Sequence, residues 1–141
     1  MSTANVVDSS GWLEYFTDSD RASLFASAIE DAENLLVPVI SIYEVFKKVL
    51  RERGEDDALQ IASMMQGGRL IDLDCALALE AARHSLPLAD SIIYATAMRH
   101  EAILWTQDEH FKDLPNVRYF PKPPGLTTET SIARSPDASR G

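Results

Sequence analysis

Four acidic residues in this sequence stand close to the ends of short apolar runs, and carboxylates gathered at one place can bind a divalent metal ion. Asp8 follows NVV, Glu44 lies in VISIYEV, Asp90 opens DSIIYATA, and Asp108 is separated by one residue from AILWT. Mg²⁺ and Mn²⁺ suit carboxylate and water ligands, whereas Zn²⁺ prefers cysteine and histidine. Neither C-x-x-C nor H-E-x-x-H occurs. The acids therefore predict a Mg²⁺ or Mn²⁺ site.

Each of these acids also has an ordinary explanation as a helix cap. Ser41 to Glu44 fits the S-x-x-E capping box, Asp90 and Asp108 stand where N-caps belong, and Asp8 can accept the amides of the turn that follows it. A favourable helix end contributes roughly 0.3 to 1 kcal/mol per carboxylate. Two like charges about 5 Å apart repel by roughly 3 kcal/mol at an effective dielectric near 20. Clustered acids would therefore need raised pKa values or a bound cation.

Short β-like runs alternate with longer helical ones, and this order of elements would position the acids. We predict strands at 5–7, 34–39, 69–72, 102–106 and 117–120, and helices at 9–16, 20–31, 41–53, 56–66, 75–84 and 90–100, with a helical turn at 108–113. Such alternation favours right-handed crossovers and a parallel sheet covered on both faces. The expected fold is an α/β, three-layer α/β/α sandwich with a central, mostly parallel sheet. Ligands of such sheets bind beyond the carboxyl ends of the strands.

Length and composition fit one soluble domain. The chain has 141 residues, 45% of them hydrophobic, and a formal charge of -9 that opposes non-specific binding to nucleic acid or anionic membrane. Cys75 is the only cysteine, and no apolar run approaches the roughly 18 residues of a membrane span. We expect a cytoplasmic protein without a membrane partner. Residues 1–120 form the expected domain, and the Pro/Ser-rich residues 121–141 are expected to be a flexible or partner-ordered tail.

The motifs in register resemble a PIN domain, and more narrowly the VapC-type toxins of bacterial toxin-antitoxin pairs. The resemblance depends on VVDSSGWLEYF, VISIYEV, LPLADSIIYATA and ILWTQDEHF followed by LPNVRYF, which together span residues 5–120. It implies a PIN-like fold and a metal-dependent endoribonuclease that hydrolyses RNA and is neutralised by a cognate antitoxin protein. It also implies a homodimer. The catalytic and metal-binding residues would be Asp8, Glu44, Asp90 and Asp108, with Asp8 and Asp90 as principal ligands and Ser9 and Thr106 in support.

Two further groups of residues are candidates for contacts with macromolecules. The basic residues Lys47, Lys48, Arg51 and Arg53 could guide an RNA backbone, although a solvated helix face explains such a run as well. The resemblance and the bulky side chains of an early helix suggest an antitoxin groove, with core packing as the alternative. The groove candidates are Trp12, Phe16, Phe46 and Leu50, with Tyr15 beside them.

Other function classes remain open at this point. A catalytically silent PIN-like interaction module would share the fold without turnover. An aspartate-dependent phosphatase would want a second acid two residues after the first, but Asp8 is followed by Ser9 and Ser10. A phosphoacceptor signalling domain would want a lysine after a late strand, where this chain has Asp108. The three histidines, His84, His100 and His110, are expected at surfaces or helix ends rather than as ligands.

Overall fold

The computed structural model describes residues 2–123, in which five strands form one parallel sheet. The strands are β1 (Asn5–Val7), β2 (Leu35–Pro38), β3 (Arg69–Ile71), β4 (Ile103–Thr106) and β5 (Val117–Tyr119). Their order across the sheet is β3-β2-β1-β4-β5, and every neighbouring pair is parallel. The predicted parallel sheet is therefore confirmed, with β5 at one edge, one residue shorter than the predicted strand at 117–120.

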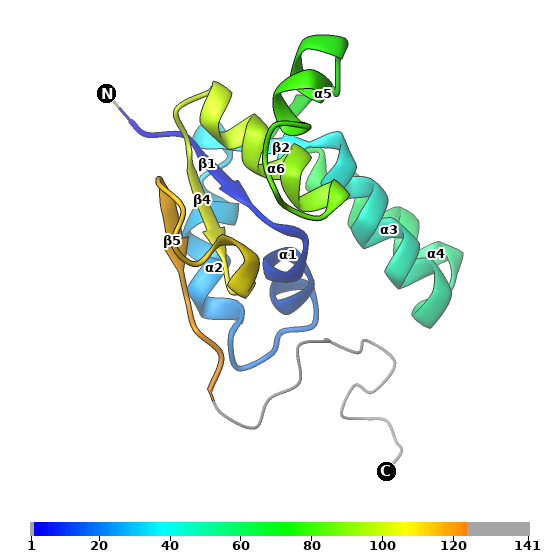
Figure 1. Ribbon diagram of the computed structural model, residues 1–141. Coiled ribbons are helices and arrows are strands. Elements are labelled where there is room, and N and C mark those ends of the chain that lie inside the picture. Colours follow the sequence, from blue (N-terminus) through cyan, green and yellow to red (C-terminus); the bar gives the residue numbers. More distant parts are fainter. Residues whose placement is uncertain (1, 124–141) are drawn as a thin grey trace.

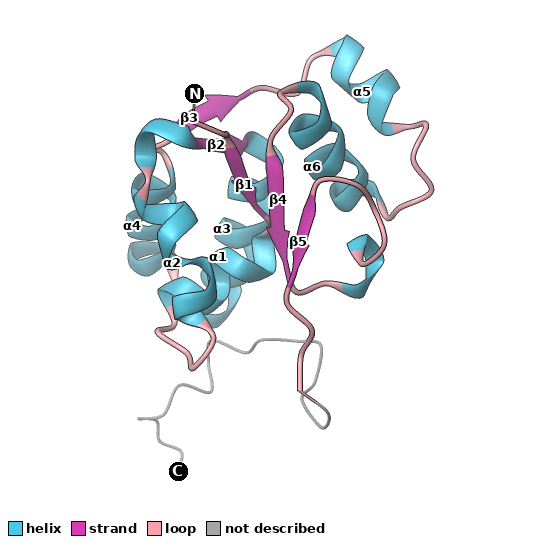
Figure 2. Ribbon diagram, turned by 90° about the vertical axis from the view of Figure 1, so that its left-hand side faces the viewer, coloured by secondary structure: helices cyan, strands magenta, loops and turns pink. Residues whose placement is uncertain are grey.

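Helices cover both faces of this sheet and complete three layers. They are α1 (Ser9–Phe16), α2 (Ala22–Glu30), α3 (Val39–Arg53), α4 (Glu55–Met65), α5 (Cys75–Ala81) and α6 (Leu88–Arg99), with 3₁₀ turns η1 (Ala32–Asn34) and η2 (Glu109–Phe111). Figure 2 shows the sheet with α1, α2 and α4 on one side and α5 and α6 on the other. Successive residues of a strand point to opposite faces of the sheet, and each face carries its own hydrophobic core. Val7 packs in the core with α1 to α4, whereas Val6 packs in the core with α6. The expected α/β/α sandwich is confirmed.

The strand order explains why distant acids share one edge. From β1 the chain moves outward through β2 to β3, and then returns through α5 and α6 to place β4 on the other side of β1 (Figure 2). Figure 1 shows β1, β4 and β5 side by side. Neighbouring strands whose connections leave in opposite directions form a crevice beyond their carboxyl ends, where ligands of open sheets bind. Asp8 follows β1 and Asp108 follows β4, so both lie at this crevice.

Gly11 allows α1 to begin directly above β1. A Cβ at this position would lie 2.7 Å from Val7 Cγ1 and 2.8 Å from Phe25 Cδ1, closer than side-chain carbons approach one another. Only glycine therefore permits this contact between α1, β1 and α2. The close approach fixes the first turn of α1, and with it Asp8.

Three predicted helix boundaries were wrong. The helix predicted at 75–84 ends at Ala81, and the other two concern candidate site residues. Helix α3 begins at Val39 with Pro38 as its N-cap residue, so Ser41 does not cap it and the capping box does not form. Helix α6 begins at Leu88 after Pro87, which places Asp90 in the first turn rather than at the N-cap. At the starts of α3 and α6 a proline, whose fixed φ suits the residue at a helix start, defines the boundary.

The end of α3 and the start of α5 follow their sequence signals. Helix α3 ends at Gly54, whose φ of 97° is accessible to glycine, and Asp74 caps α5 by accepting the Leu77 amide at 2.8 Å. Residues 124–141, which hold most of the predicted tail, lie outside the described part. In residues 2–123 no helix has both the length and the apolar character needed to cross a bilayer.

Candidate metal centre

Asp8 lies at the centre of the crevice and is almost fully buried, with 4% of its surface exposed. One carboxylate oxygen accepts the Gly11 amide at 3.0 Å, which confirms that Asp8 caps α1. The other accepts the Thr106 hydroxyl at 2.6 Å, and the Ser10 hydroxyl donates at 3.2 Å. A cap needs only the first of these bonds. The bond from β4 shows that the carboxylate is also held by the strand that carries Asp108.

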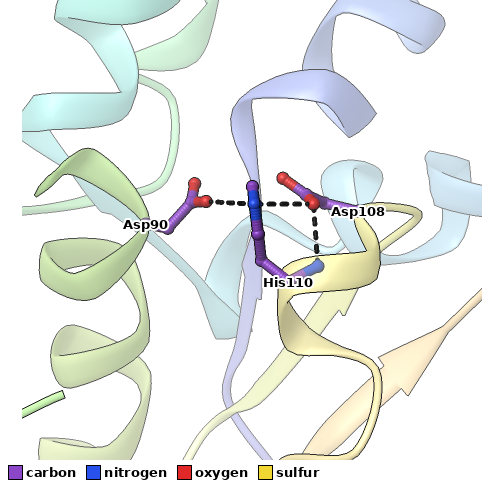
Figure 3. A group of neighbouring side chains, drawn as sticks. All are labelled: Asp90, Asp108 and His110. Carbon is purple, nitrogen blue, oxygen red and sulfur yellow. Dashed lines mark hydrogen bonds and ion pairs between the residues drawn. The ribbon is translucent and has the colours of Figure 1, made fainter. Parts of the chain in front are cut away.

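Asp90 and Asp108 meet on either side of His110. Asp90 comes from the first turn of α6, while Asp108 precedes η2 and His110 lies within it (Figure 3). His110 Nδ1 lies 3.0 Å from Asp90 Oδ2 and 3.0 Å from Asp108 Oδ1. One ligand atom from each of the three residues falls within 4.8 Å of the others. Asp90 from α6 and Asp108 from the loop after β4 thus lie together, and the charge of Asp108 also acts on Asp8.

Glu44 joins this group through Ser9. The Ser9 hydroxyl donates to Glu44 Oε1 at 2.6 Å, which ties the second turn of α3 to the residue that follows Asp8. The negative charge of Glu44 also raises the pKa of Asp90. Glu44 therefore faces the crevice instead of folding back onto the start of its own helix.

The electrostatics of the crevice are unfavourable for four ionised acids. Burial raises the pKa of Asp8 to about 7, assisted by the charge of Asp108 and opposed by hydrogen bonds from Thr106 and Gly11. Burial also raises the pKa of Asp90 to about 6, with further increases from Asp108 and Glu44. Among the ion pairs of residues 2–123, none joins a lysine or arginine to any of the four acids.

The donor set suits a hard divalent cation. The carboxylates of Asp90, from α6, and Asp108, from the start of η2, lie together, and carboxylate oxygens are the ligands that Mg²⁺ and Mn²⁺ prefer. A cation would also remove the cause of the raised pKa values, because it favours the ionised acids. His110 adds one nitrogen donor that the sequence reasoning set aside. In the sequence, the only indication was that His110 lies two residues after Asp108. The tight turn of η2 brings its imidazole against the Asp108 carboxylate.

The basic candidates lie on α3, beyond Glu44. Lys48 Nζ lies 3.2 Å from Glu52, and Arg51 lies 3.8 Å from the same carboxylate. Lys47 lies over the ring of Tyr43, 5.5 Å from its centroid. Most of this run is thus engaged in pairs along its own helix, as a solvated face would be.

The groove candidates divide into two pairs. Trp12 and Phe16 stack at 5.6 Å and line a cavity of about 220 Å³ between α1, α2 and α4. Phe46 packs against the adjoining core, and Leu50 is exposed on α3, but neither lines this cavity. Trp12 Nε1 is buried and has no hydrogen-bond partner within residues 2–123.

One protein family matches most of this chain. The model of the PIN domain matches residues 6–117, a range that begins in β1, ends in β5 and contains all four acids. The chain belongs to the PIN domain family. No curated protein sequence matches it.

Solved structures share this PIN fold. A toxin-antitoxin complex from Klebsiella pneumoniae is 21% identical with a TM-score of 0.65, covering 82% of this chain and 96% of that chain. VapBC2 from Rickettsia felis, bound to a promoter DNA fragment, is 12% identical with a TM-score of 0.64, covering 84% and 98%. VapC20 from Mycobacterium tuberculosis, a Sarcin-Ricin loop cleaving toxin, is 13% identical with a TM-score of 0.58, covering 70% and 85%. Identities at this level show a common PIN fold.

Proposed function

We propose that this PIN domain is a Mg²⁺- or Mn²⁺-dependent endoribonuclease that acts as the toxin of a toxin-antitoxin pair. The observation that supports the proposal best is the meeting of Asp90 and Asp108 beside His110, together with the charge of Asp108 acting on Asp8. Within residues 2–123 no lysine or arginine forms an ion pair with these acids. A divalent ion balances their charge and, when bound, lowers the pKa of a water molecule and stabilises charge on a phosphate. The acidic chain could then accept a polyanion at this one place.

In this proposal Asp8 and Asp90 are the principal ligands, and Asp108 and Glu44 complete the site. Thr106 orients two of these acids, because its hydroxyl donates to Asp8 and accepts the amide of Asp108 at 2.9 Å. Ser9 holds Glu44 in the same way from α1. His110 holds the carboxylates of Asp90 and Asp108 at a fixed spacing, and its imidazole is a further possible ligand.

RNA contacts are proposed on the α3 surface next to Glu44. Lys47 is the preferred candidate for a phosphate contact, because its ammonium lies over Tyr43 instead of in an ion pair with Glu52. Lys48 and Arg51 would first have to exchange their carboxylate partner for a phosphate. They are therefore weaker candidates for binding an RNA backbone.

Cleavage of RNA by folded variants tests the nuclease proposal. Asp8→Asn and Asp90→Asn should abolish Mn²⁺-dependent cleavage of a mixed RNA substrate while retaining the circular dichroism of the parent. Asp74→Asn is a matched control, since Asp74 caps α5 as Asp8 caps α1 but lies on an exposed surface. Cleavage by both site variants at the parent rate would refute the proposal. Metal binding without any cleavage by the parent would instead indicate a silent interaction module.

The cavity beside α1 is the proposed seat of an antitoxin segment. Its lining is mainly apolar, and Trp12 Nε1 offers a buried donor that an acceptor of the partner could satisfy. The similar structure from Klebsiella pneumoniae is a toxin-antitoxin complex, which supports this kind of partner. Apolar side chains of a short peptide would fill the space between Trp12, Phe16 and Met64.

Antitoxin binding tests the groove independently of catalysis. Trp12→Phe and Phe16→Ala should weaken binding of the cognate antitoxin by roughly tenfold or more, because anchors of this kind carry much of an interface's energy. Leu79→Ala, which removes an exposed apolar side chain from α5, is the control and should bind as the parent does. Unchanged affinity of both folded groove variants would exclude this surface.

A further inference from the structure

A buried polar network joins the site loop to two other parts of the chain. Gln107, which lies between Thr106 and Asp108 and is 2% exposed, donates through Nε2 to Glu14 Oε2 at 2.7 Å. Its Oε1 accepts from Arg21 Nε at 2.6 Å. Arg21 Nη2 also donates to the carbonyl oxygen of Phe120 at 2.9 Å. The network thus connects α1, the residue before α2 and the chain that leaves β5 to a single side chain of the loop.

The chemistry of the partners allows only one orientation of the Gln107 amide. Glu14 as a carboxylate offers only acceptors, so the NH₂ group must face it. Arg21 offers only donors, so the amide oxygen must face Arg21. Ser19 also donates to Glu14 Oε1, which fixes the carboxylate from the other side. Both ends of the amide are therefore determined, and bonds to charged groups are the stronger kind.

Three consecutive residues of the loop are held by three different anchors. Thr106 bonds to Asp8, Gln107 to Glu14, and Asp108 to His110. The first and third anchors belong to the candidate metal centre, and the second lies outside it. The backbone that carries Asp108 is thus also held by a contact outside the acidic cluster.

We propose that Gln107 is a positioning residue, clamped between Glu14 and Arg21, that fixes the place of Thr106 and Asp108 relative to Asp8. The expected effect of the clamp on metal affinity and turnover rests on the proposed function. Partners that orient ligands from outside a metal site commonly change affinity or activity by roughly 10- to 100-fold when altered. The clamp itself is a property of the folded chain and can be tested without metal.

Exchanging the carboxylate of Glu14 and the amide of Gln107 tests the clamp directly. Gln107→Glu alone places two carboxylates in contact and should lower Mn²⁺ affinity and kcat by roughly tenfold, with little change in the KM for RNA. The double variant Glu14→Gln with Gln107→Glu restores both bonds, because the new amide donates to the new carboxylate, which still accepts from Arg21. It should recover Mn²⁺ affinity and kcat to within a factor of about three. Ile61→Val, a core change in α4, is the stability control.

A metal-free readout separates this inference from the nuclease proposal. The Asp108 amide donates to Thr106 Oγ1, so its hydrogen exchange should accelerate in Gln107→Glu and slow again in the double variant. If the parent neither binds Mn²⁺ nor cleaves RNA, the nuclease proposal fails, but this exchange pattern still supports the clamp. Arg21→Met serves if Gln107→Glu does not fold, and the same amide should exchange faster. The inference would be overturned if folded Gln107→Glu or Arg21→Met kept the hydrogen exchange of the Asp108 amide and the Mn²⁺ affinity of the parent. It would also be overturned if the folded double variant did not recover them.

Discussion

Replacement of Asp8 by asparagine should stabilise the metal-free protein at neutral and alkaline pH, although it removes a principal ligand. The carboxylate is 4% exposed, and burial raises its pKa to about 7. Asparagine still accepts the Gly11 amide and caps helices about as well as aspartate. The change therefore removes the buried charge and keeps the cap. It also disturbs the bond from Thr106, whose hydroxyl loses a charged acceptor.

The magnitude follows from the shift in pKa. A rise in the pKa of Asp8 from 3.8 to about 7 lowers the free energy of unfolding of the parent by roughly 4 kcal/mol at pH values above that raised pKa, at about 1.4 kcal/mol per pH unit. In Asp8→Asn the loss of the Thr106 bond destabilises the variant by roughly 1 to 3 kcal/mol, which offsets part of this gain. A net stabilisation of about 1 to 3 kcal/mol is expected near pH 8. Because the folded-state pKa is raised, the cost of the charge shrinks as pH falls, and the advantage of asparagine should drop by roughly 2 kcal/mol near pH 5.5.

Urea unfolding of Asp8→Asn and the parent, with chelator and with Mn²⁺, measures these effects. Metal at about 100 times its Kd should stabilise the parent by about 2.7 kcal/mol and the variant far less. Asp74→Asn is the control, because hydrogen bonding from the Leu77 amide lowers the pKa of Asp74, the opposite direction. An Asp8→Asn protein that is less stable than the parent near pH 8 without metal, or equally stabilised by Mn²⁺, would refute the reasoning.

Three more changes probe single contacts. Ser9→Ala removes the donor to Glu44 and should cost about 1 kcal/mol in metal-free urea unfolding; an unchanged value would mean that the bond does not form in solution. Gly11→Ala places a methyl group 2.7 Å from Val7 Cγ1 and should lower the unfolding free energy by about 1 to 3 kcal/mol; parent-like stability would contradict the close approach of α1. The pKa of His110 is raised, chiefly by Asp108, so metal-free His110→Gln should lose more stability near pH 6 than near pH 9. A loss that does not vary with pH would contradict the contact.

The alternation of elements was readable in the sequence because each strand is a short apolar run and each helix has its own periodicity. Asp8 could be placed at the end of β1 for the same reason. The strand order β3-β2-β1-β4-β5 could not be predicted from the sequence, because it depends on which strand edges pair in the folded chain. Convergence of Asp8 with Asp108 followed only from the general behaviour of parallel sheets. Glu44 and Asp90 needed the actual packing of α3 and α6.

Local capping signals failed where tertiary packing decided the helix start. Ser41 and Glu44 have the spacing of a capping box, yet Ser41 is buried within α3 and its hydroxyl has no partner in the described residues. Helix α3 starts earlier because Pro38 ends β2 and its fixed φ suits the entry to the helix. Glu44 is thereby turned toward Ser9, a contact across 35 residues that no local motif encodes.

The contacts of His110 and Gln107 also could not be read from sequence. A histidine two residues after Asp108 reaches Asp90 only because η2 turns it back toward α6. Gln107 occupies a position between two candidate site residues and carries no catalytic signal of its own. Its importance depends on the buried partner Glu14, which the sequence presents as one polar residue in an aromatic helix.

The most direct test of a metal centre built from distant acids is the anomalous scattering of Mn²⁺ in crystals of the protein. We expect a peak about 2.1 Å from carboxylate oxygens of both Asp8 and Asp90, with Asp108 contributing directly or through water. A peak at another surface under saturating Mn²⁺, or an undisturbed set of contacts between His110 and the two aspartates with no peak beside them, would contradict it.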